Sequence, residues 1–193
     1  MSEATAFLKA FLENPLAVGS VFPSSPHAAA RMVKNIKPNE NAIVLELGCG
    51  TGPFTEAAER ILPSPNCYLG IELNEELAGI LQEKFPHLNI VCGDASKASE
   101  IHQKSGLGEV KYIISGLPWA SLPEEVSQAV LEDVDKFMSR GGCEFRTIQY
   151  ATSTPLPSAK KFRRMMNKKY GKAHRSRLVW RNLPPTFIFT WRT

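Results

Sequence analysis

The chain has 193 residues, of which 43% are hydrophobic and 22% charged, and this balance predicts a folded protein with a sizeable core. Its four cysteines form no CxxC pair and no histidine is spaced to complete a zinc site, so the sequence predicts neither a disulfide framework nor a metal centre. No apolar run approaches the roughly 18 residues of a spanning helix, and no positively charged N-terminus precedes an apolar run, so we expect neither a spanning helix nor a signal peptide. We therefore expect a cytoplasmic protein that meets a membrane only peripherally, at its inner face.

Charge is distributed unevenly along the chain. Residues 1–139 hold 10 Lys and Arg against 18 Asp and Glu, a net charge of −8. Residues 140–193 hold 13 Lys and Arg and a single acid, Glu144, a net charge of +12. The basic residues concentrate in 160–181, which is typical of proteins that contact an anionic lipid surface or nucleic acid. A solvated basic face is the alternative.

Two helices are predicted ahead of the first strand. Apolar residues at helical spacing indicate an amphipathic helix that ends at Asn14-Pro15. An alanine-rich stretch predicts a second helix, Ala28–Ile36, with an N-cap in the turn Pro23-Ser24-Ser25-Pro26.

From Ala42 onward, β-rich runs alternate with helical stretches. This alternation predicts an α/β fold with a parallel sheet and helices on both faces. The predicted strands are Ile43–Leu47, Tyr68–Leu73, Asn89–Cys92, Tyr112–Ser115 and Cys143–Tyr150, and the predicted helices are Phe54–Ile61, Glu75–Phe85 and Pro123–Met138.

The tail adds a basic helix, Ala159–Tyr170, and two strand-like runs, Ser176–Trp180 and Thr186–Trp191. The short link Asn182–Pro185 predicts that the two runs form a hairpin, so we expect the sheet to end in an antiparallel strand.

No linker is long enough to divide the chain, so we expect one domain over residues 1–193. Its expected parts are a helical cap (1–37), a cofactor-binding core (42–150), and a basic segment with the terminal hairpin (151–193).

A glycine-rich loop, Glu46-Leu47-Gly48-Cys49-Gly50-Thr51-Gly52, follows the first strand. Glycines let the backbone approach a ligand, and the amides that open the next helix point toward it. Glu72 ends the following strand, 20 residues beyond Gly52, where a carboxylate can accept hydrogen bonds from ribose hydroxyls. Asp94 follows the third strand, so three successive strands end in polar groups at the edge where open α/β sheets bind ligands.

This set of residues resembles the S-adenosylmethionine-binding set of class I methyltransferases. The resemblance implies that the methionine part lies along the glycine loop, that Glu72 holds the ribose, and that Asp94 reads the adenine amine. It also implies a Rossmann-like, mostly parallel sheet of seven strands with one antiparallel strand inside it, and no metal. The cofactor-binding residues that it implies are Glu46, Gly48, Gly50, Thr51, Gly52, Glu72, Leu73, Asp94 and Ala95.

Two further stretches, Val18–Ser25 and Ser115–Pro123, resemble the bacterial phospholipid N-methyltransferases, and Val179–Pro185 is similar to that family's end. The resemblance covers nearly the whole chain. It implies a lipid amine, such as that of phosphatidylethanolamine, as the substrate.

More distantly, the layout resembles the ribosomal RNA adenine dimethylases, in which Asn precedes a Leu-Pro-aromatic run. Gly116 stands at that position here and offers no side-chain acceptor to localise the lone pair of an adenine amine. An alkylamine is already a good nucleophile once it loses its proton, so Gly116 favours the lipid amine. An RNA adenine methyltransferase, and a cofactor-binding protein that recognises a polyanion without turnover, are the alternatives.

The implied reaction is direct attack of an amine on a sulfonium methyl group, in which catalysis is mostly positioning and exclusion of water. We expect Trp119 to meet a methylated ammonium by cation–π contact. Tyr150 is a candidate to touch the amine through its hydroxyl, and a core or rim tyrosine is the alternative. Asn182 is a candidate for the same pocket or for the turn before the two prolines. The candidate catalytic residues are Ser115, Gly116, Pro118, Trp119 and Tyr150.

The first predicted helix carries Lys9 against Glu3 and Glu13, so it lacks the basic polar face of a membrane anchor. We expect the basic segment 160–181 to supply the attraction to an anionic leaflet, although the same segment would suit RNA phosphates.

Overall fold

The computed structural model describes residues 23–193, so the predicted helix that ends at Asn14-Pro15 lies outside the described residues. The helices are α2 (Pro26–Val33), α3 (Pro53–Glu59), α4 (Glu75–Lys84), α5 (Ala98–Ser105), α6 (Glu124–Met138) and α7 (Pro157–Tyr170), with short 3-10 turns η2 (Pro65–Cys67) and η3 (Ala95–Lys97). The strands are β1 (Ile43–Leu47), β2 (Tyr68–Glu72), β3 (Asn89–Cys92), β4 (Val110–Ser115), β5 (Glu144–Tyr150), β6 (His174–Arg175) and β7 (Thr186–Arg192).

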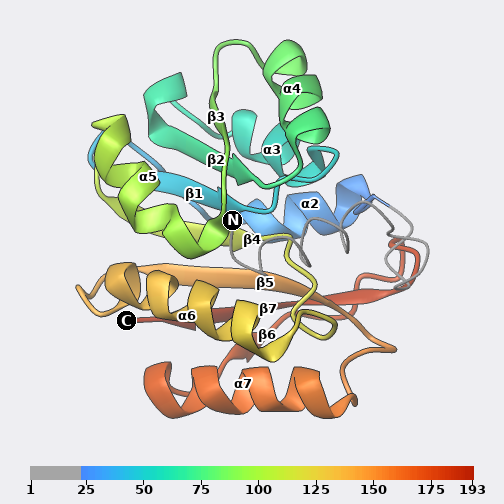
Figure 1. Cartoon of the computed structure of the whole chain (residues 1–193). Coiled ribbons are helices and arrows are strands. Elements are labelled where there is room, and N and C mark those ends of the chain that lie inside the picture. The colour runs from blue at the N-terminus through green and yellow to red at the C-terminus, as the bar shows by residue number, and fades with distance from the viewer. Residues whose placement is uncertain (1–22) are drawn as a thin grey trace.

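All seven strands form one sheet in the order β3-β2-β1-β4-β5-β7-β6 (Figure 1). Strands β1 to β5 run parallel to one another, whereas β7 is antiparallel to both β5 and β6. The predicted α/β class and the single antiparallel strand inside the sheet are confirmed. Because β1 to β5 are parallel, their carboxyl ends share one edge.

Helices cover both faces of the sheet. α2, α3 and α4 pack on one face, and α5, α6 and α7 pack on the other. All five residues of β1 are buried, as expected of a central parallel strand. Alternation along β1 directs Leu45 and Leu47 to the α5–α7 face and Val44 to the opposite face. Glu46 therefore points toward α3.

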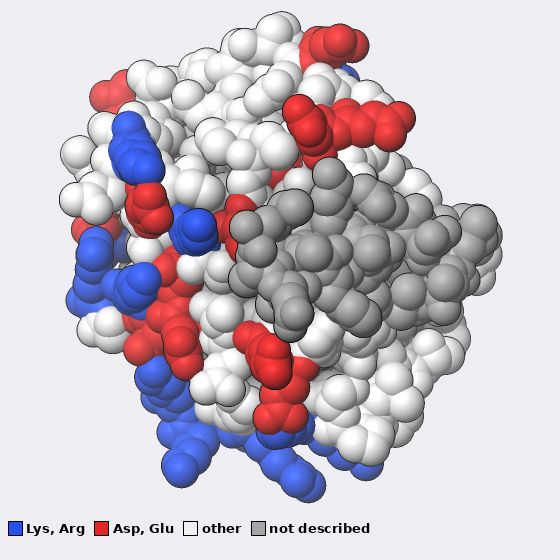
Figure 2. Space-filling view, in the orientation of Figure 1, with Lys and Arg blue, Asp and Glu red and all other residues white. Residues whose placement is uncertain are grey.

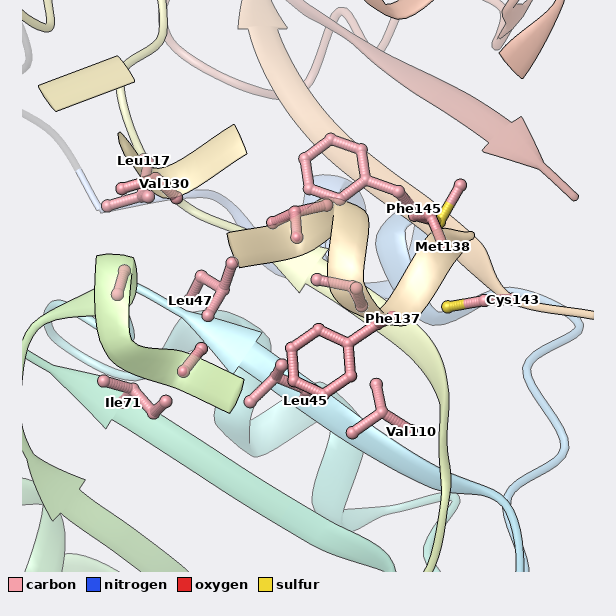
Figure 3. Packing of buried hydrophobic residues seen from close by; sticks show 14 of the residues in the cluster. Leu45, Leu47, Ile71, Val110, Leu117, Val130, Phe137, Met138, Cys143 and Phe145 are labelled. Atoms are coloured by element: carbon pink, nitrogen blue, oxygen red, sulfur yellow. The ribbon is translucent and has the colours of Figure 1, made fainter. Parts of the chain in front are cut away.

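α6 shows how sequence spacing produces the core. Its buried residues recur every three or four positions, so that one stripe of the helix faces the sheet. Figure 3 shows Phe137 and Met138 of α6 among Leu45, Val110 and Phe145 of the strands. This packing holds the sheet that carries the site.

The sequence pattern predicts no helix between β3 and β4, and this prediction is wrong because η3 and α5 lie there. Ala98 is the one fully buried residue of α5, so the helix has little apolar periodicity. The Asp133 carboxylate of α6 accepts hydrogen bonds from both the amide and the hydroxyl of Ser99, each 2.6 Å long. A tertiary contact thus stabilises a helix that the local pattern does not reveal.

The strand predicted at Ser176–Trp180 is also wrong in position. β6 consists of His174–Arg175, and beyond it Val179 forms an isolated bridge to Thr186. The chain leaves the sheet after Ser176, whose amide donates to the Ile188 carbonyl at 2.9 Å. The other predicted elements within the described residues begin and end within three residues of the observed ones.

Candidate functional site

The carboxyl ends of the parallel strands bring the predicted site segments together. The Gly48 amide donates to the carbonyl of Ile71 in β2 at 2.9 Å. The Gly116 amide donates to the carbonyl of Leu47 in β1, also at 2.9 Å. Backbone hydrogen bonds therefore place the glycine loop between the segments that leave β2 and β4.

Three glycines give the loop its shape. Gly48, Gly50 and Gly52 have φ angles of 73°, 56° and 86°, a region that side chains strain to adopt. A Cβ on Gly52 would lie 2.5 Å from Cδ2 of Leu81 in α4, so this glycine is also required for packing. A Cβ on Gly50 would meet no heavy atom within 4 Å. The loop therefore leaves open space against the backbone at Gly50, where a ligand can approach.

Glu72 fixes this loop to β2. Its side chain is 2% exposed, Oε2 accepts from the Gly50 amide at 2.7 Å, and Oε1 accepts from the Asn74 amide at 2.9 Å. Each carboxylate oxygen can accept a second hydrogen bond. The geometry thus fits a carboxylate that orders the loop and still has lone pairs for ribose hydroxyls.

Glu46 lies behind the loop in a buried polar cluster. Its Oε2 accepts from the Tyr68 hydroxyl at 2.7 Å and from the Thr55 hydroxyl at 3.1 Å. Its Oε1 is buried without a hydrogen-bond partner among residues 23–193. Burial raises the pKa of Glu46 to about 8, and burial also raises the pKa of the neighbouring Tyr68 phenol and Cys49 thiol. An unpartnered buried carboxyl oxygen beside the loop fits a ligand that brings a positively charged N–H group, which would lower the pKa of Glu46 and so let the oxygen accept.

Sequence reasoning missed Tyr68 and Thr55. The available signal was the acid itself, because a carboxylate on a fully buried strand needs polar partners from its neighbours. No local spacing identifies those partners.

The remaining cofactor residues surround the same edge. Asp94 is half-buried, and its Oδ1 caps η3 by accepting from the Ser96 amide at 2.8 Å. Ala95 is buried, Leu73 is half-buried, and Thr51 is exposed. Their contacts with a cofactor stay predictions.

Ser115 and Gly116 leave β4 against the glycine loop. The buried Ser115 Oγ accepts from the Trp119 indole N–H at 3.1 Å, so this hydroxyl positions the turn. A Cβ on Gly116 would lie 2.5 Å from the carbonyl oxygen of Gly48. Because that oxygen belongs to the backbone, position 116 has no room for the side-chain acceptor of the adenine dimethylases.

Trp119 packs in the core on the α7 side. It is 2% exposed and stacks on Phe162 of α7, with ring centroids 4.6 Å apart. The structure gives the indole a packing role, and its contact with a methylated ammonium stays a prediction. Pro118 is half-buried in the same turn, and Tyr150 is half-buried at the end of β5. Their catalytic roles also stay predictions.

Asn182 fastens the loop before β7. Its Oδ1 accepts from the Ser25 amide at 2.8 Å, and its Nδ2 donates to the Pro184 carbonyl at 2.8 Å. These contacts agree with a role for Asn182 in the turn before the two prolines, and they join that turn to Ser25, the N-cap of α2.

A cavity of about 660 Å³ lies between α2 and α3. Its lining is mainly apolar, and Thr51 of the glycine loop belongs to its wall. Within residues 23–193, no group of three or more His, Cys, Asp or Glu could hold a metal ion. None of the described helices is both long and apolar enough to cross a membrane.

The chain is similar in sequence to known methyltransferases. The family model of the methyltransferase domain matches residues 44–142. The ornithine lipid N-methyltransferase of Singulisphaera acidiphila is 32% identical over 173 residues, which cover 86% of each chain. The ribosomal RNA small subunit methyltransferase A of Thermotoga neapolitana is 30% identical over 103 residues, which cover 51% of this chain and 38% of that protein.

Solved structures share the fold. An S-adenosylmethionine-dependent methyltransferase from Anabaena variabilis superposes with a TM-score of 0.64 at 12% identity, covering 100% of this chain and 96% of that one. Aeropyrum pernix fibrillarin, solved with natively bound S-adenosyl-L-methionine, superposes with a TM-score of 0.58 at 17% identity, covering 85% and 73%. The expected Rossmann-like methyltransferase fold is confirmed. With its glycine loop, its strand-end acids and these matches, the chain belongs to the methyltransferase domain family, and its cofactor is S-adenosylmethionine.

Proposed function

We propose that this methyltransferase methylates the amine of a lipid headgroup, phosphatidylethanolamine or a related aminolipid. The observation that carries the proposal is the close approach of Gly116 to the Gly48 carbonyl, which leaves no room for a side-chain acceptor at position 116. An alkylamine does not need that acceptor, whereas an adenine amine does. The similarity to an ornithine lipid N-methyltransferase over most of both chains supports the same substrate class.

The chain's own residues hold and orient the reactants. S-adenosylmethionine supplies an electrophilic methyl group on a sulfonium. Glu72 would hold the ribose, Asp94 the adenine amine, and the backbone at Gly50 the methionine part. Glu46 offers its vacant buried oxygen to a donor beside the loop.

The amine is held by few groups. An alkylammonium must lose one proton before its nitrogen can attack, and its remaining N–H bonds then need acceptors that aim the lone pair. The backbone carbonyl of Gly116 and the Tyr150 hydroxyl are the acceptors that we propose. Catalysis in this arrangement consists of orientation and exclusion of water.

The outer face of α7 is the proposed contact with an anionic lipid surface. Ala159, Phe162 and Met166 are buried, so the opposite side of the helix faces solvent. Figure 2 shows Lys and Arg gathered at the lower end of the molecule, where Figure 1 places α7. We call the exposed cations of this helix the basic face, and they are Lys160, Lys161, Arg164, Lys168 and Lys169. Lys161 and Lys169 pair with Glu124 and Asp135, so the attraction rests mainly on the other three cations, each of which contributes on the order of 1 kcal/mol near an anionic leaflet.

Arg163 does not belong to the basic face. Its guanidinium donates to the Gln149 side chain at 2.6 Å and to the Thr154 carbonyl at 2.8 Å. It therefore fastens α7 to the end of β5, and a test of surface charge should leave it unchanged.

An RNA adenine methyltransferase is the second candidate. The basic face and the similarity to ribosomal RNA methyltransferases favour it. Those relatives, however, match about half of this chain, whereas the lipid enzyme matches 86% of it.

Substrate competition tests the proposal. The full chain is incubated with S-adenosylmethionine labelled in its methyl group, and phosphatidylethanolamine vesicles, phosphatidylcholine vesicles and structured RNA are offered in parallel. We expect label in phosphatidylethanolamine and none in phosphatidylcholine, whose nitrogen is already quaternary. Label in RNA alone would overturn the proposal.

Two sets of variants sharpen the test. Glu72→Ala should lower transfer to every acceptor because it weakens cofactor binding, whereas Glu75→Ala, an exposed acid nearby, should not. Lys160→Gln with Arg164→Gln and Lys168→Gln should lower transfer on anionic vesicles but not to lipid dispersed in a neutral detergent.

A further inference from the structure

Two large apolar side chains are exposed in one loop. Trp180 is 75% exposed and Leu183 is 68% exposed, the highest values among the large hydrophobic residues of 23–193 that face solvent. The other two tryptophans, Trp119 and Trp191, are 2% and 1% exposed. Single exposed apolar residues are ordinary, but a largely exposed tryptophan and a largely exposed leucine in one short loop leave more apolar area in water than a scattered residue does.

The loop that carries them, Val179–Pro185, is fixed by its inward residues. The Val179 amide donates to the Thr186 carbonyl at 2.8 Å, and Val179 is 7% exposed. Asn182 is 2% exposed and bonds to the Ser25 amide. Val179 and Asn182 are thus buried beside the exposed residues of the loop, and the fold holds Trp180 and Leu183 toward solvent.

The loop lies at the edge of the sheet where the site is. It leads into β7 at Thr186, which pairs with Tyr150 at the carboxyl end of β5. The Ala151 amide, just after β5, donates to the Pro185 carbonyl at 2.8 Å. A surface that receives this loop would therefore face the edge that carries the cofactor loop.

Cations surround the apolar pair. Arg177 and Arg181 are exposed on either side of Trp180, and residues 145–193 contain no acid. An apolar tip with an indole, flanked by guanidinium groups, matches the bilayer interface, where aromatic rings lie at headgroup depth and cations reach phosphates.

We propose that Val179–Pro185 is a membrane-insertion loop. Trp180 and Leu183 enter the interface of a bilayer that contains anionic lipid, while Arg177 and Arg181 contact its phosphates. The inference deepens the proposed function and rests on it for the choice of a lipid surface. It also gives the surface an orientation, with the cofactor edge toward the headgroups.

The exposed tryptophan provides the test. The full chain is titrated with vesicles of phosphatidylethanolamine and phosphatidylglycerol, with phosphatidylcholine vesicles as the uncharged comparison, and tryptophan emission is recorded. We expect the emission maximum to move to shorter wavelength with the anionic vesicles, and brominated acyl chains to quench it. Trp180→Phe should bind the vesicles but lose the spectral change, which assigns the signal to this residue.

Apolar truncation separates insertion from charge. Trp180→Ser with Leu183→Ser should weaken vesicle binding about tenfold or more, because two large apolar side chains no longer leave water. Cofactor affinity should not change. Ile80→Ser is the matched control, since Ile80 is 51% exposed on α4 and should leave vesicle binding unchanged.

The outcomes distinguish the two proposals. Anionic vesicles that neither shift nor quench the emission would overturn the insertion loop. Quenching by structured RNA in place of vesicles would assign Trp180 to base stacking and overturn it as well. Insertion without methylation of any lipid amine would overturn the proposed function and leave the insertion loop standing. Methylation of detergent-dispersed lipid by the double variant, with activity on vesicles lost, would support both.

Discussion

Glu46→Gln should change how the stability of the protein depends on pH. The substitution keeps the shape of the side chain and keeps an acceptor for the Tyr68 and Thr55 hydroxyls, but it removes the titratable group. In the folded protein without cofactor, burial raises the pKa of Glu46 from 4.5 to about 8. An unfolded chain exposes the same carboxyl to water, where its pKa returns to the ordinary value.

The sign follows from proton counting. Between about pH 4.5 and pH 8 the unfolded chain has released the Glu46 proton while the folded protein keeps it, so raising the pH draws the equilibrium toward unfolding. The stabilisation that Glu46 contributes is present at low pH, falls through this window, and is lost above pH 8. Since one pKa unit corresponds to roughly 1.4 kcal/mol, the loss across the window is of the order of 5 kcal/mol.

Urea denaturation between pH 5 and pH 8.5 measures this effect. The free energy of unfolding of Glu46→Gln should gain several kcal/mol on that of the unchanged protein as the pH rises. Glu75→Gln removes an exposed carboxyl from the first turn of α4 and should follow the unchanged protein throughout. Parallel curves for Glu46→Gln and the unchanged protein would refute the reasoning, because they would show that Glu46 titrates normally in the fold.

Four further substitutions test the site and its supports. Glu72→Ala should weaken cofactor binding by roughly 1.5 to 3 kcal/mol in calorimetry, whereas Glu75→Ala should not; equal affinities would show that Glu72 does not hold the ribose. Gly52→Ala should lower the free energy of unfolding by about 1 to 3 kcal/mol because its Cβ would crowd α4. The Cβ of Gly50→Ala would meet no heavy atom within 4 Å. The loss of cofactor affinity, relative to the loss of stability, should therefore be larger for Gly50→Ala than for Gly52→Ala. Asp133→Ala should cost about 2 kcal/mol in thermal or urea unfolding, since it leaves two donors of α5 unpaired; an unchanged midpoint would show that water replaces the carboxylate.

The alternating strands and helices from Ala42 onward are predictable because the sequence of each strand and of the turn after it indicates the element locally. The run Ile43–Leu47 is apolar at every position except Glu46, and the glycines after it mark the turn into a helix. The helix α5 was not predictable in this way, since Ala98 is its one fully buried residue and Asp133, which holds it, lies on a distant helix.

The site likewise contains residues that a local sequence signal identifies and contacts that depend on distant parts of the chain. Glu72 was identified from its spacing to the glycine loop and its place at a strand end, and the structure places it against Gly50. The partners of Glu46 and the packing of Trp119 depend on which helices cross which face of the sheet. Spacing along the chain does not contain that information, so these contacts required the three-dimensional fold.

The position of β7 has a consequence for the order in which the molecule assembles. β7 lies between β5 and β6, and its pairing joins Glu144 to Arg192 across most of the chain's final quarter. The first four strands can associate through short crossovers, whereas the outer edge of β5 stays open until residues 186–192 dock. During that interval β5, which carries Phe145 and Ile148, offers unpaired backbone groups to any other chain. We therefore expect the last strand to govern how quickly the sheet closes and how far the folding chain is exposed to aggregation.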